Sequence, residues 1–167
     1  LQPSQPAGFG DGLEQVGTVL GNPVGWAENL GDRIMGVRLG SGDHGVEYNF
    51  GEYRYGSIQG AVYHDLNDNG LFETHESGIE GVELQLYDSQ GNLLERASTD
   101  AQGRYQFGEL LAGTYRVVEI QPEGFVDGKD ALGTVGGMPI GAVESDGDGM
   151  AGITLAAGKA GIDYNSV

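Results

Sequence analysis

Alternating apolar and polar side chains mark the second part of the chain as β-structure. Residues 82–87 (Val-Glu-Leu-Gln-Leu-Tyr) alternate strictly, the pattern of a strand with one buried face, and residues 114–120 follow a similar alternation. Turn-forming clusters of Asp, Asn, Ser and Gly separate the apolar stretches. Further strands are predicted at 58–63, 93–99, 104–107, 153–155 and 161–164. Because the one helix candidate, residues 109–112, is too short, the pattern predicts an all-β sandwich or barrel.

The alternation weakens in a glycine-rich stretch between Asp127 and Gly152, where apolar residues are scattered. Residues 12–36 have the same character. We expect a long, ordered loop excursion in both places. Periodicity does not decide whether short strands form within it.

An internal repeat with an offset of 116 residues relates these two stretches. Residues 8–50 align without a gap to residues 124–166, and 19 of the 43 pairs are identical. The motif Gly8-Phe9-x-Asp11-Gly12, for example, recurs as Gly124-Phe125-x-Asp127-Gly128. Such a repeat is the signature of a modular array in which each unit contacts its neighbours.

The repeat predicts the domain organisation. Residues 1–52 are expected to be the C-terminal part of one repeat whose first half is missing, and residues 53–167 a complete repeat. The chain is then either a piece of a tandem array or a two-domain protein with a truncated first unit. Whether residues 1–52 fold alone is open at this stage.

Composition excludes several classes of function. The 25 Asp and Glu residues outnumber the 8 Lys and Arg, for a net charge of −17, so phosphate backbones and anionic membrane surfaces would repel the chain. No apolar run approaches the roughly 18 residues of a membrane span, and we expect no direct membrane insertion. With no Cys, disulfides, zinc–thiolate sites and thiol nucleophiles are also excluded.

One segment carries a recognisable chemistry. Residues 65–76 match the calcium-loop pattern D-x-[DN]-x-[DN]-G-x5-E at every specified position. Ca²⁺ is a hard cation that takes about six to eight oxygen ligands, and Gly70 permits the sharp turn that such a loop needs. A strand is predicted before this loop and Gly78 follows it, so the loop lies on a β scaffold and not in an EF-hand domain. The predicted ligands are the side chains of Asp65, Asn67 and Asn69, the backbone carbonyl of Leu71, Glu73 directly or through water, and the bidentate carboxylate of Glu76.

The alternative for this segment is a polar turn without an ion, because Asp, Asn and Gly favour turns in any context. Against it stands the uncompensated repulsion among four carboxylates of the loop, those of Asp65, Asp68, Glu73 and Glu76. Two further acidic clusters are weaker. The first, Glu144, Asp146 and Asp148, is a second ion-site candidate. The other is the turn Asp127-Gly128-Lys129-Asp130, which matches Asp11 to Glu14 in the first repeat. For this second turn, a local charge pair is the preferred interpretation.

The sequence does not indicate an enzyme. His44, His64 and His75 lack metal-ligand spacing, and His64 and His75 are expected to face solvent. No serine lies in a G-x-S-x-G motif. Trp26, Tyr53 and Tyr55 would suit a sugar-binding platform, although isolated aromatic residues more often contribute to packing.

Five sequence blocks in a fixed order resemble the B-type repeat of serine-aspartate-repeat surface adhesins, a branch of the collagen-adhesin B-type (prealbumin-like) domains. The resemblance covers residues 56–167, and residues 1–52 are similar to the tail of another copy. The blocks are Gly60-x-Val62-Tyr63-x-Asp65-x-Asn67-x-Asn69-Gly70, Gly78-Ile79-x-Gly81-Val82-x-Leu84-x-Leu86, Thr99-Asp100-x-x-Gly103-x-Tyr105-x-Phe107, Leu111-x-Gly113-Thr114-Tyr115-x-Val117-x-Glu119, and Pro122-x-Gly124-Phe125.

The resemblance implies a Greek-key β-sandwich of about seven strands with transthyretin-like topology, calcium in the loop 65–76, and a spacer role in a secreted, cell-surface protein. Many relatives carry a Lys–Asn isopeptide bond that an acid at the position of Glu119 catalyses. The strand 57–63 has no lysine here, and the only two lysines are Lys129 and Lys159. No isopeptide bond is therefore expected, and we expect Glu119 to contribute to packing or hydrogen bonding instead.

Two classes of function follow. The first is a calcium-stabilised structural module whose partners are adjacent repeats of the same chain. The second is a calcium-dependent module that binds an extracellular protein or a glycan, which would need an exposed apolar patch near the loops.

Overall fold

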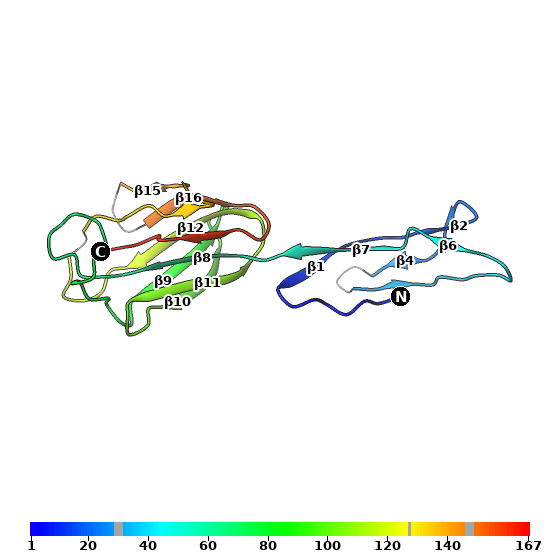
Figure 1. Ribbon diagram of the computed structural model, residues 1–167, viewed down its shortest axis with the longest axis horizontal. Coiled ribbons are helices and arrows are strands. Elements are labelled where there is room, and N and C mark those ends of the chain that lie inside the picture. Colours follow the sequence, from blue (N-terminus) through cyan, green and yellow to red (C-terminus); the bar gives the residue numbers. More distant parts are fainter. Residues whose placement is uncertain (29–31, 127, 146–148) are drawn as a thin grey trace. The chain divides into compact units, whose positions relative to one another are not determined.

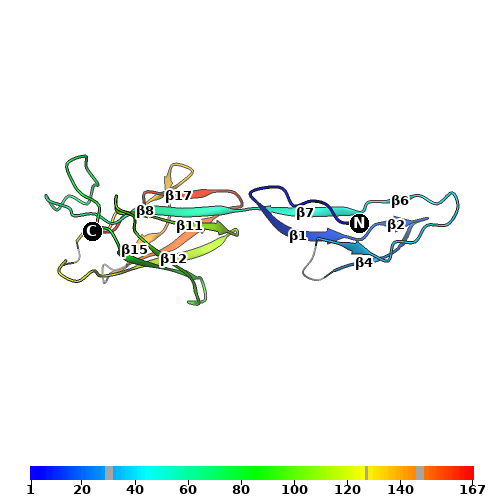
Figure 2. The same ribbon diagram turned by 90° about the horizontal axis from the view of Figure 1, so that it is seen from below.

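In the computed structural model, the alternating segments form β-strands, and the described residues contain no helix. The structure describes residues 1–28, 32–126, 128–145 and 149–167. The chain divides into unit 1, Leu1–Arg54, and unit 2, Tyr55–Val167. Figures 1 and 2 show the strands of the two units.

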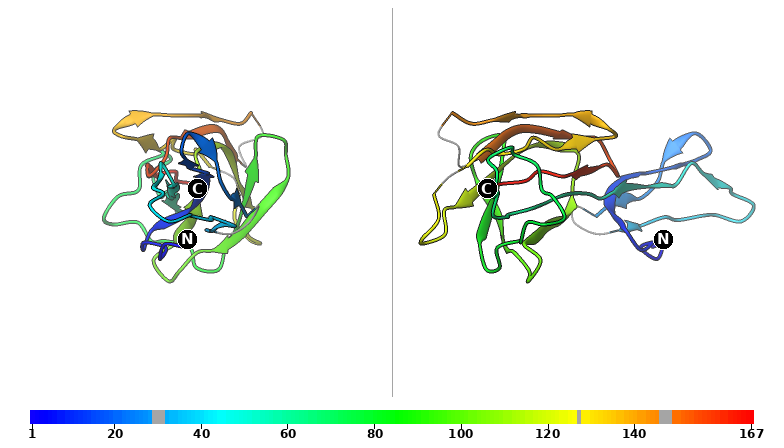
Figure 3. Two further views of the ribbon diagram at one scale, coloured as in Figure 1. Left: turned by 90° about the vertical axis from the view of Figure 1, so that its right-hand side faces the viewer. Right: turned by 60° about the vertical axis from the view of Figure 1, so that its left-hand side comes forward.

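Unit 2 is a sandwich of two five-stranded sheets (Figure 3). One sheet has the order β10-β9-β12-β16-β15 and the other the order β11-β8-β17-β13-β14. The strands of the first sheet are β9 (Glu83–Asp88), β10 (Leu93–Ser98), β12 (Gly113–Ile120), β15 (Ala142–Val143) and β16 (Gly149–Leu155). Those of the second are β8 (Gly56–Ala61), β11 (Arg104–Leu110), β13 (Thr134–Val135), β14 (Met138–Pro139) and β17 (Ala160–Ile162).

The core lies between the two sheets, where the apolar positions of the alternating strands meet. Leu84 and Leu86 from β9 and Phe107 from β11 have no exposed surface, and Ile58 from β8 and Ile153 from β16 are equally buried. Full burial of a side chain of this size stabilises the fold by about 1.5–3 kcal/mol. The sandwich predicted from the alternation is therefore confirmed.

All seven strands predicted in unit 2 are present, with ends that differ by a few residues. The predicted strand 104–107 extends to Leu110 and includes part of the helix candidate. A bulge lies between Phe107 and Leu110, where Glu109 has a positive φ of 52°, so the backbone bends without turning into a helix.

In its described residues, the glycine-rich excursion contains the two-residue strands β13, β14 and β15, which extend both sheets. Gly136 and Gly137 join β13 to β14 with φ values of 61° and 81°. Two successive positive φ angles are typical of the tight hairpin turn that matches strand twist. The dense glycine of this stretch thus permits tight turns within an ordered region.

Unit 1 repeats the late strands of unit 2. Its strands are β1 (Phe9–Gln15), β2 (Thr18–Val19), β3 (Asn22–Pro23), β4 (Trp26–Ala27), β5 (Ile34–Met35), β6 (Gly45–Val46) and β7 (Asn49–Arg54). β2 pairs with β6 through Thr18 and Val46, as β13 pairs with β17 through Thr134 and Ile162, each 116 residues later.

A side-chain hydrogen bond is repeated at the same offset. The Tyr48 hydroxyl donates to the Val24 carbonyl oxygen at 2.8 Å, and the Tyr164 hydroxyl donates to the Ile140 carbonyl oxygen at 2.8 Å. The sequence repeat therefore corresponds to a structural repeat of the second half of the sandwich.

Candidate calcium loop

The loop 65–76 connects β8 to β9 at one end of the unit 2 sandwich, beside the C-terminus (Figure 1). An isolated bridge between Tyr63 and Gly78 closes its base. The strand β8 precedes the loop, and no helix follows it among the described residues. The loop therefore lies on a β scaffold, as the sequence predicted.

The first half of the loop is wound by successive side-chain-to-backbone hydrogen bonds. Asp65 accepts from the backbone N–H of Asn67 at 3.1 Å and of Gly70 at 2.7 Å. Asn67 accepts from Asn69 N–H at 3.1 Å, and Asn69 accepts from Leu71 N–H at 2.7 Å. These bonds direct the side-chain oxygens of alternate residues toward the inside of the turn, which is what the calcium pattern requires.

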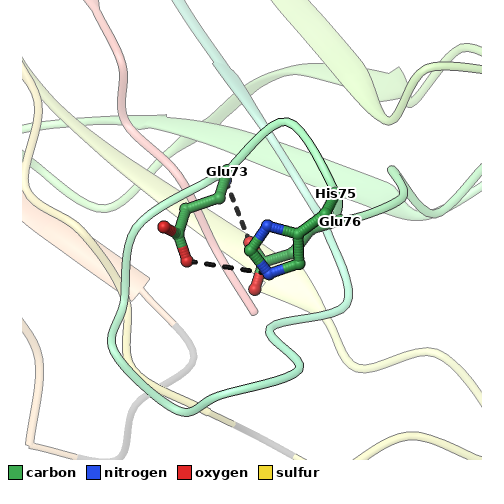
Figure 4. A group of neighbouring side chains, drawn as sticks. All are labelled: Glu73, His75 and Glu76. Atoms are coloured by element: carbon green, nitrogen blue, oxygen red, sulfur yellow. Dashed lines mark hydrogen bonds and ion pairs between the residues drawn. The ribbon is translucent and has the colours of Figure 1, made fainter.

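The second half of the loop contributes two glutamates. One Glu73 oxygen accepts from the side-chain amides of Asn67 at 2.7 Å and Asn69 at 3.0 Å. The two oxygens of Glu76 accept separately from the backbone N–H of Leu66 and of Glu73, each at 3.0 Å. Figure 4 shows the bond between Glu73 and Glu76. Since Glu76 is buried, its carboxylate fastens the start of the loop to its end.

The five predicted side-chain ligands therefore lie in one hydrogen-bonded network, while Leu71 is connected to it through its N–H. Their donor chemistry fits Ca²⁺, because each offers a hard oxygen and three are carboxylates. The side-chain nitrogens of Asn67 and Asn69 donate to Glu73 while their oxygens accept backbone N–H groups, so the lone pairs left on these two oxygens are the ones that could reach an ion.

His75 is a neighbour of the glutamates that sequence reasoning did not connect with them. Glu73, His75 and Glu76 each place a potential ligand atom within 4.8 Å of the others (Figure 4). Both His75 and His64 are exposed, as predicted. Imidazole is not a preferred ligand of Ca²⁺, so His75 fits the rim of an oxygen site better than its ligand set.

Tyr63 forms the floor of the loop. Its side chain is fully buried, and its ring stacks on Phe72 with a centroid distance of 4.6 Å. Desolvation and then the negative charges of Asp65 and Glu76, with smaller contributions from Asp130 and Glu73, raise the pKa of the Tyr63 hydroxyl to about 12. The acidic loop thus lies directly over an apolar support.

Lys129 ties the loop to the glycine-rich excursion. Its Nζ donates to the Asp68 carbonyl oxygen at 2.6 Å and lies 3.0 Å from the Asp68 carboxylate. Lys129 therefore pairs with a residue 61 positions away, while Asp127 of the predicted local charge pair lies outside the described residues. A pairing this distant in sequence leaves no signal in local spacing.

The first carboxylate of the loop carries a perturbed pKa. Desolvation alone would raise the pKa of Asp65, but hydrogen bonds from the backbone N–H groups of Gly70, Asn67, Asn69 and Asp68 together outweigh it and lower the pKa below 3.8. The folded loop therefore favours the ionised form of Asp65.

A pH dependence follows from this shift. Because the folded pKa of Asp65 is depressed, its contribution to stability is fully present above the unfolded pKa of 3.8 and is lost as the pH falls through the folded value. Without calcium, we expect the melting temperature of unit 2 to decrease below about pH 4. Thermal melts followed by tyrosine circular dichroism will measure it, and an Asp65→Asn variant should show a smaller acid decrease. An equal decrease in both proteins would contradict the assignment to Asp65.

The other acidic candidates differ in their surroundings. Glu144 forms an ion pair with Arg116 at 2.6 Å, while Asp146 and Asp148 lie outside the described residues, as does Asp127. In unit 1, the carboxylate of Asp32 lies close to those of Asp11 and Glu14, and one oxygen of each lies within 4.8 Å of the others. Sequence reasoning missed Asp32 in this cluster, because Asp32 lies 18 positions after Glu14 and no local spacing connects the two.

The structure places Glu119 and Asn165 inside unit 2. Glu119 is 5% exposed, and the Asn165 side-chain oxygen accepts the backbone N–H of Ala61 at 2.9 Å. Asn165 thus bonds the backbone of the residue that ends β8, a strand without lysine. The absence of an isopeptide bond remains a prediction.

Comparisons with known proteins identify a matching family and several relatives. The model of the SdrD B-like domain matches residues 56–162. Serine-aspartate repeat-containing protein D of Staphylococcus aureus (strain Newman) is 40% identical over 88 residues, which are 51% of this chain and 6% of that protein. Serine-aspartate repeat-containing protein C of the same strain is 33% identical over 138 residues, 83% of this chain and 13% of that protein. The chain thus spans a small part of both relatives.

Two solved structures are more distantly similar. A structure of BcpA, the major pilin subunit of Bacillus cereus, has a TM-score of 0.37 and 18% identity, over 68% of this chain and 29% of the other. The Bacillus anthracis TIE protein has a TM-score of 0.43 and 15% identity, over 90% of this chain and 25% of the other. No helix of the described residues has the length and apolarity to cross a membrane. On its match to the family model over residues 56–162, the chain belongs to the SdrD B-like domain family.

Proposed function

We propose that unit 2 is a calcium-stabilised spacer module, with Ca²⁺ held by Asp65, Asn67, Asn69, Leu71, Glu73 and Glu76. The observation that supports this most strongly is the shared hydrogen-bond network of the five ligand side chains, which forms over the buried Tyr63. A bound cation would neutralise carboxylates that otherwise repel one another, and it would fix a loop that joins the two sheets. Ca²⁺ would bind the folded loop and not the unfolded chain, which adds stability by mass action.

The spacer role depends on how the chain divides into repeats. We infer that residues 53–167 are a complete B-type repeat and that residues 1–52 are the C-terminal part of another. The matched pairings of β2–β6 and β13–β17 support this assignment. The partners of the module are then adjacent repeats of the same protein, as expected of a domain that covers 6% to 13% of its large relatives.

A calcium titration of the whole chain tests the ion site. Extracellular calcium modules have Kd values of about 10⁻⁴ to 10⁻³ M. At a calcium concentration near 100 Kd, we expect unit 2 to gain about 2.7 kcal/mol, or about 10 °C in melting temperature, and to lose it in chelator. The single tryptophan, Trp26, lies in unit 1, so its fluorescence follows that unit separately from the tyrosines of unit 2.

Two matched variants make this titration specific. Asp65→Asn removes a loop carboxylate and should abolish most of the calcium response. Asp88→Asn removes a carboxylate that also accepts backbone N–H bonds, from Gln90 and Asn92, but in the β9–β10 turn, and should keep the full response. A melting curve unchanged by calcium, or an equal response in both variants, would overturn the ion site.

One observation favours the second candidate, a ligand-binding module. Apolar side chains are exposed around the loop, with Leu66 and Leu71 each 61% exposed and Phe125 41% exposed. A cavity of about 480 Å³ adjoins the loop and is lined by Tyr63, His64, Asp65, Phe125 and their neighbours. A glycan array probed with and without calcium distinguishes the two functions, since a spacer alone would bind no glycan under either condition.

A further inference from the structure

We propose that Asn69 is a self-modification site, at which the backbone nitrogen of Gly70 attacks the side-chain amide and converts the asparagine to aspartate or isoaspartate. The hydrogen bonds of the loop 65–76 hold this reaction back in the folded unit, so the extent of modification depends on how often the loop opens. The reaction itself requires no cation, and only its dependence on Ca²⁺ rests on the proposed calcium site.

The sequence makes Asn69 the asparagine best suited to this reaction. Among the seven asparagines of the chain, only Asn69 is followed by glycine. Because glycine has no Cβ, its backbone nitrogen is unhindered, and the chain reaches the conformations that bring this nitrogen to the preceding side chain. Asn67, in the same loop, is followed by Asp68, whose side chain hinders the same approach.

The reaction has two balanced steps. In the first, a bond forms between the Gly70 nitrogen and the Asn69 Cγ atom, the bond from Cγ to Nδ2 breaks, and ammonia leaves with the proton of the Gly70 N–H. In the second, water opens the cyclic imide at either of its carbonyl groups, which gives aspartate or isoaspartate at position 69. Neither step needs an oxidant, a reductant or a second protein.

In the folded loop, hydrogen bonds hold the reacting groups. The Gly70 N–H donates to an Asp65 carboxylate oxygen at 2.7 Å. The Asn69 side-chain oxygen accepts from the Leu71 N–H at 2.7 Å, and the Asn69 side-chain nitrogen donates to Glu73 at 3.0 Å. The amide under attack is thus fixed at both of its polar atoms, and the attacking nitrogen is bonded to a carboxylate.

The charge of Asp65 adds to this restraint. Attack requires the Gly70 nitrogen to give up its proton, and a carboxylate in contact with it disfavours the negative charge that results. Asn69 is exposed, so water for the second step reaches it without further rearrangement. Opening of the loop therefore limits the rate, and the folded chain should react at least about tenfold more slowly than the unfolded chain.

The isoaspartate product changes the loop permanently. In isoaspartate the chain runs through the side-chain carbon, which adds a carbon atom to the backbone between Asn67 and Gly70. Gly70 has a positive φ of 72° and reaches Asp65 from that position, so the added atom displaces its N–H from the carboxylate. An opening of the loop is thereby converted into a lasting loss of its hydrogen bonds.

The experiment incubates the whole chain, residues 1–167, in chelator, in calcium and unfolded in urea. Mass spectrometry of proteolytic peptides follows Asn69, and chromatography separates the isoaspartate form. In urea, we expect Asn69 to convert at least about tenfold faster than Asn67, the internal control. In chelator, the folded chain should convert Asn69 at least about tenfold more slowly than in urea, and calcium should slow the conversion further.

Matched variants test the role of the hydrogen bond. Asp65→Ala removes the acceptor of the Gly70 N–H and should speed the conversion of Asn69 in chelator at least about threefold. Asp88→Ala makes the same change at a carboxylate that accepts backbone N–H bonds in the β9–β10 turn, and should leave the rate as in the parent.

Three results would overturn the proposal: equal rates at Asn69 and Asn67 in urea, equal rates at Asn69 in the folded and unfolded chain, or equal rates in the Asp65→Ala and Asp88→Ala variants. A rate that calcium leaves unchanged would count against the calcium dependence and against the proposed ion site. The slower conversion of the folded chain would then still establish the modification.

Discussion

Replacement of Glu76 by alanine is expected to destabilise unit 2 in chelator and to remove its response to calcium. In chelator the substitution leaves two backbone N–H groups, those of Leu66 and Glu73, without their carboxylate acceptor in a partly buried site. Hydrogen bonds to a charged acceptor contribute about 1.5–3 kcal/mol each in net terms, so we expect a loss of about 2–3 kcal/mol for the pair after water replaces part of it. In saturating calcium the difference from the parent should grow to about 5 kcal/mol.

Urea unfolding of the parent and the variant in chelator and in calcium measures both losses. Glu80→Ala is the matched control, because Glu80 is an exposed carboxylate that follows the loop closely in sequence. Its unfolding free energy should remain within about 0.5 kcal/mol of the parent. A Glu76→Ala protein that unfolds like the Glu80→Ala protein in chelator would show that the carboxylate does not fasten the loop.

Truncation of Phe107 to alanine is expected to cost about 3–5 kcal/mol of the stability of unit 2. Phe107 lies in the core between the sheets with no exposed surface, and its ring meets that of Tyr105 edge-on at 5.7 Å. Its removal deletes buried apolar area and leaves a cavity that the two sheets cannot close. Since a domain of this size has about 5–15 kcal/mol in total, the variant should be close to unfolding at 37 °C.

Thermal unfolding of unit 2, followed by tyrosine circular dichroism, measures this loss. Phe125→Ala makes the same chemical change at a ring that is 41% exposed and should cost less than about 1 kcal/mol. Trp26 fluorescence should show that unit 1 melts at the same temperature in both variants. Comparable destabilisation by the two substitutions would mean that Phe107 is not central to the core.

Much of the fold follows from local sequence patterns. The alternation in residues 82–87 predicted β9, the turn residues around Asp88 predicted the β9–β10 hairpin, and those around Asp100 predicted the turn before β11, because these patterns depend on neighbours along the chain. The compact loop 65–76 was likewise readable, since its proposed ligands and their hydrogen bonds all lie within one loop.

What the sequence did not reveal depends on partners distant along the chain. The two-residue strand β15 forms because Val143 pairs with Met150 of β16, which is itself paired with β12. A pattern of two residues is too short to predict this pairing. The pairing of Lys129 with Asp68 and the inclusion of Asp32 beside Asp11 arise in the same way. Such contacts depend on the folded topology, which local propensity does not specify.

The parallel pairing of β8 with the end of the chain has a consequence for how unit 2 carries tension. β8 begins the unit at Gly56, and the residues that pair with it, from Ala160 to Ser166, end it. Because the two segments run in the same direction, a force that pulls the ends of the unit apart slides one strand along the other. The hydrogen bonds between them are then loaded together in shear and do not open one after another, so the topology itself resists extension along the chain.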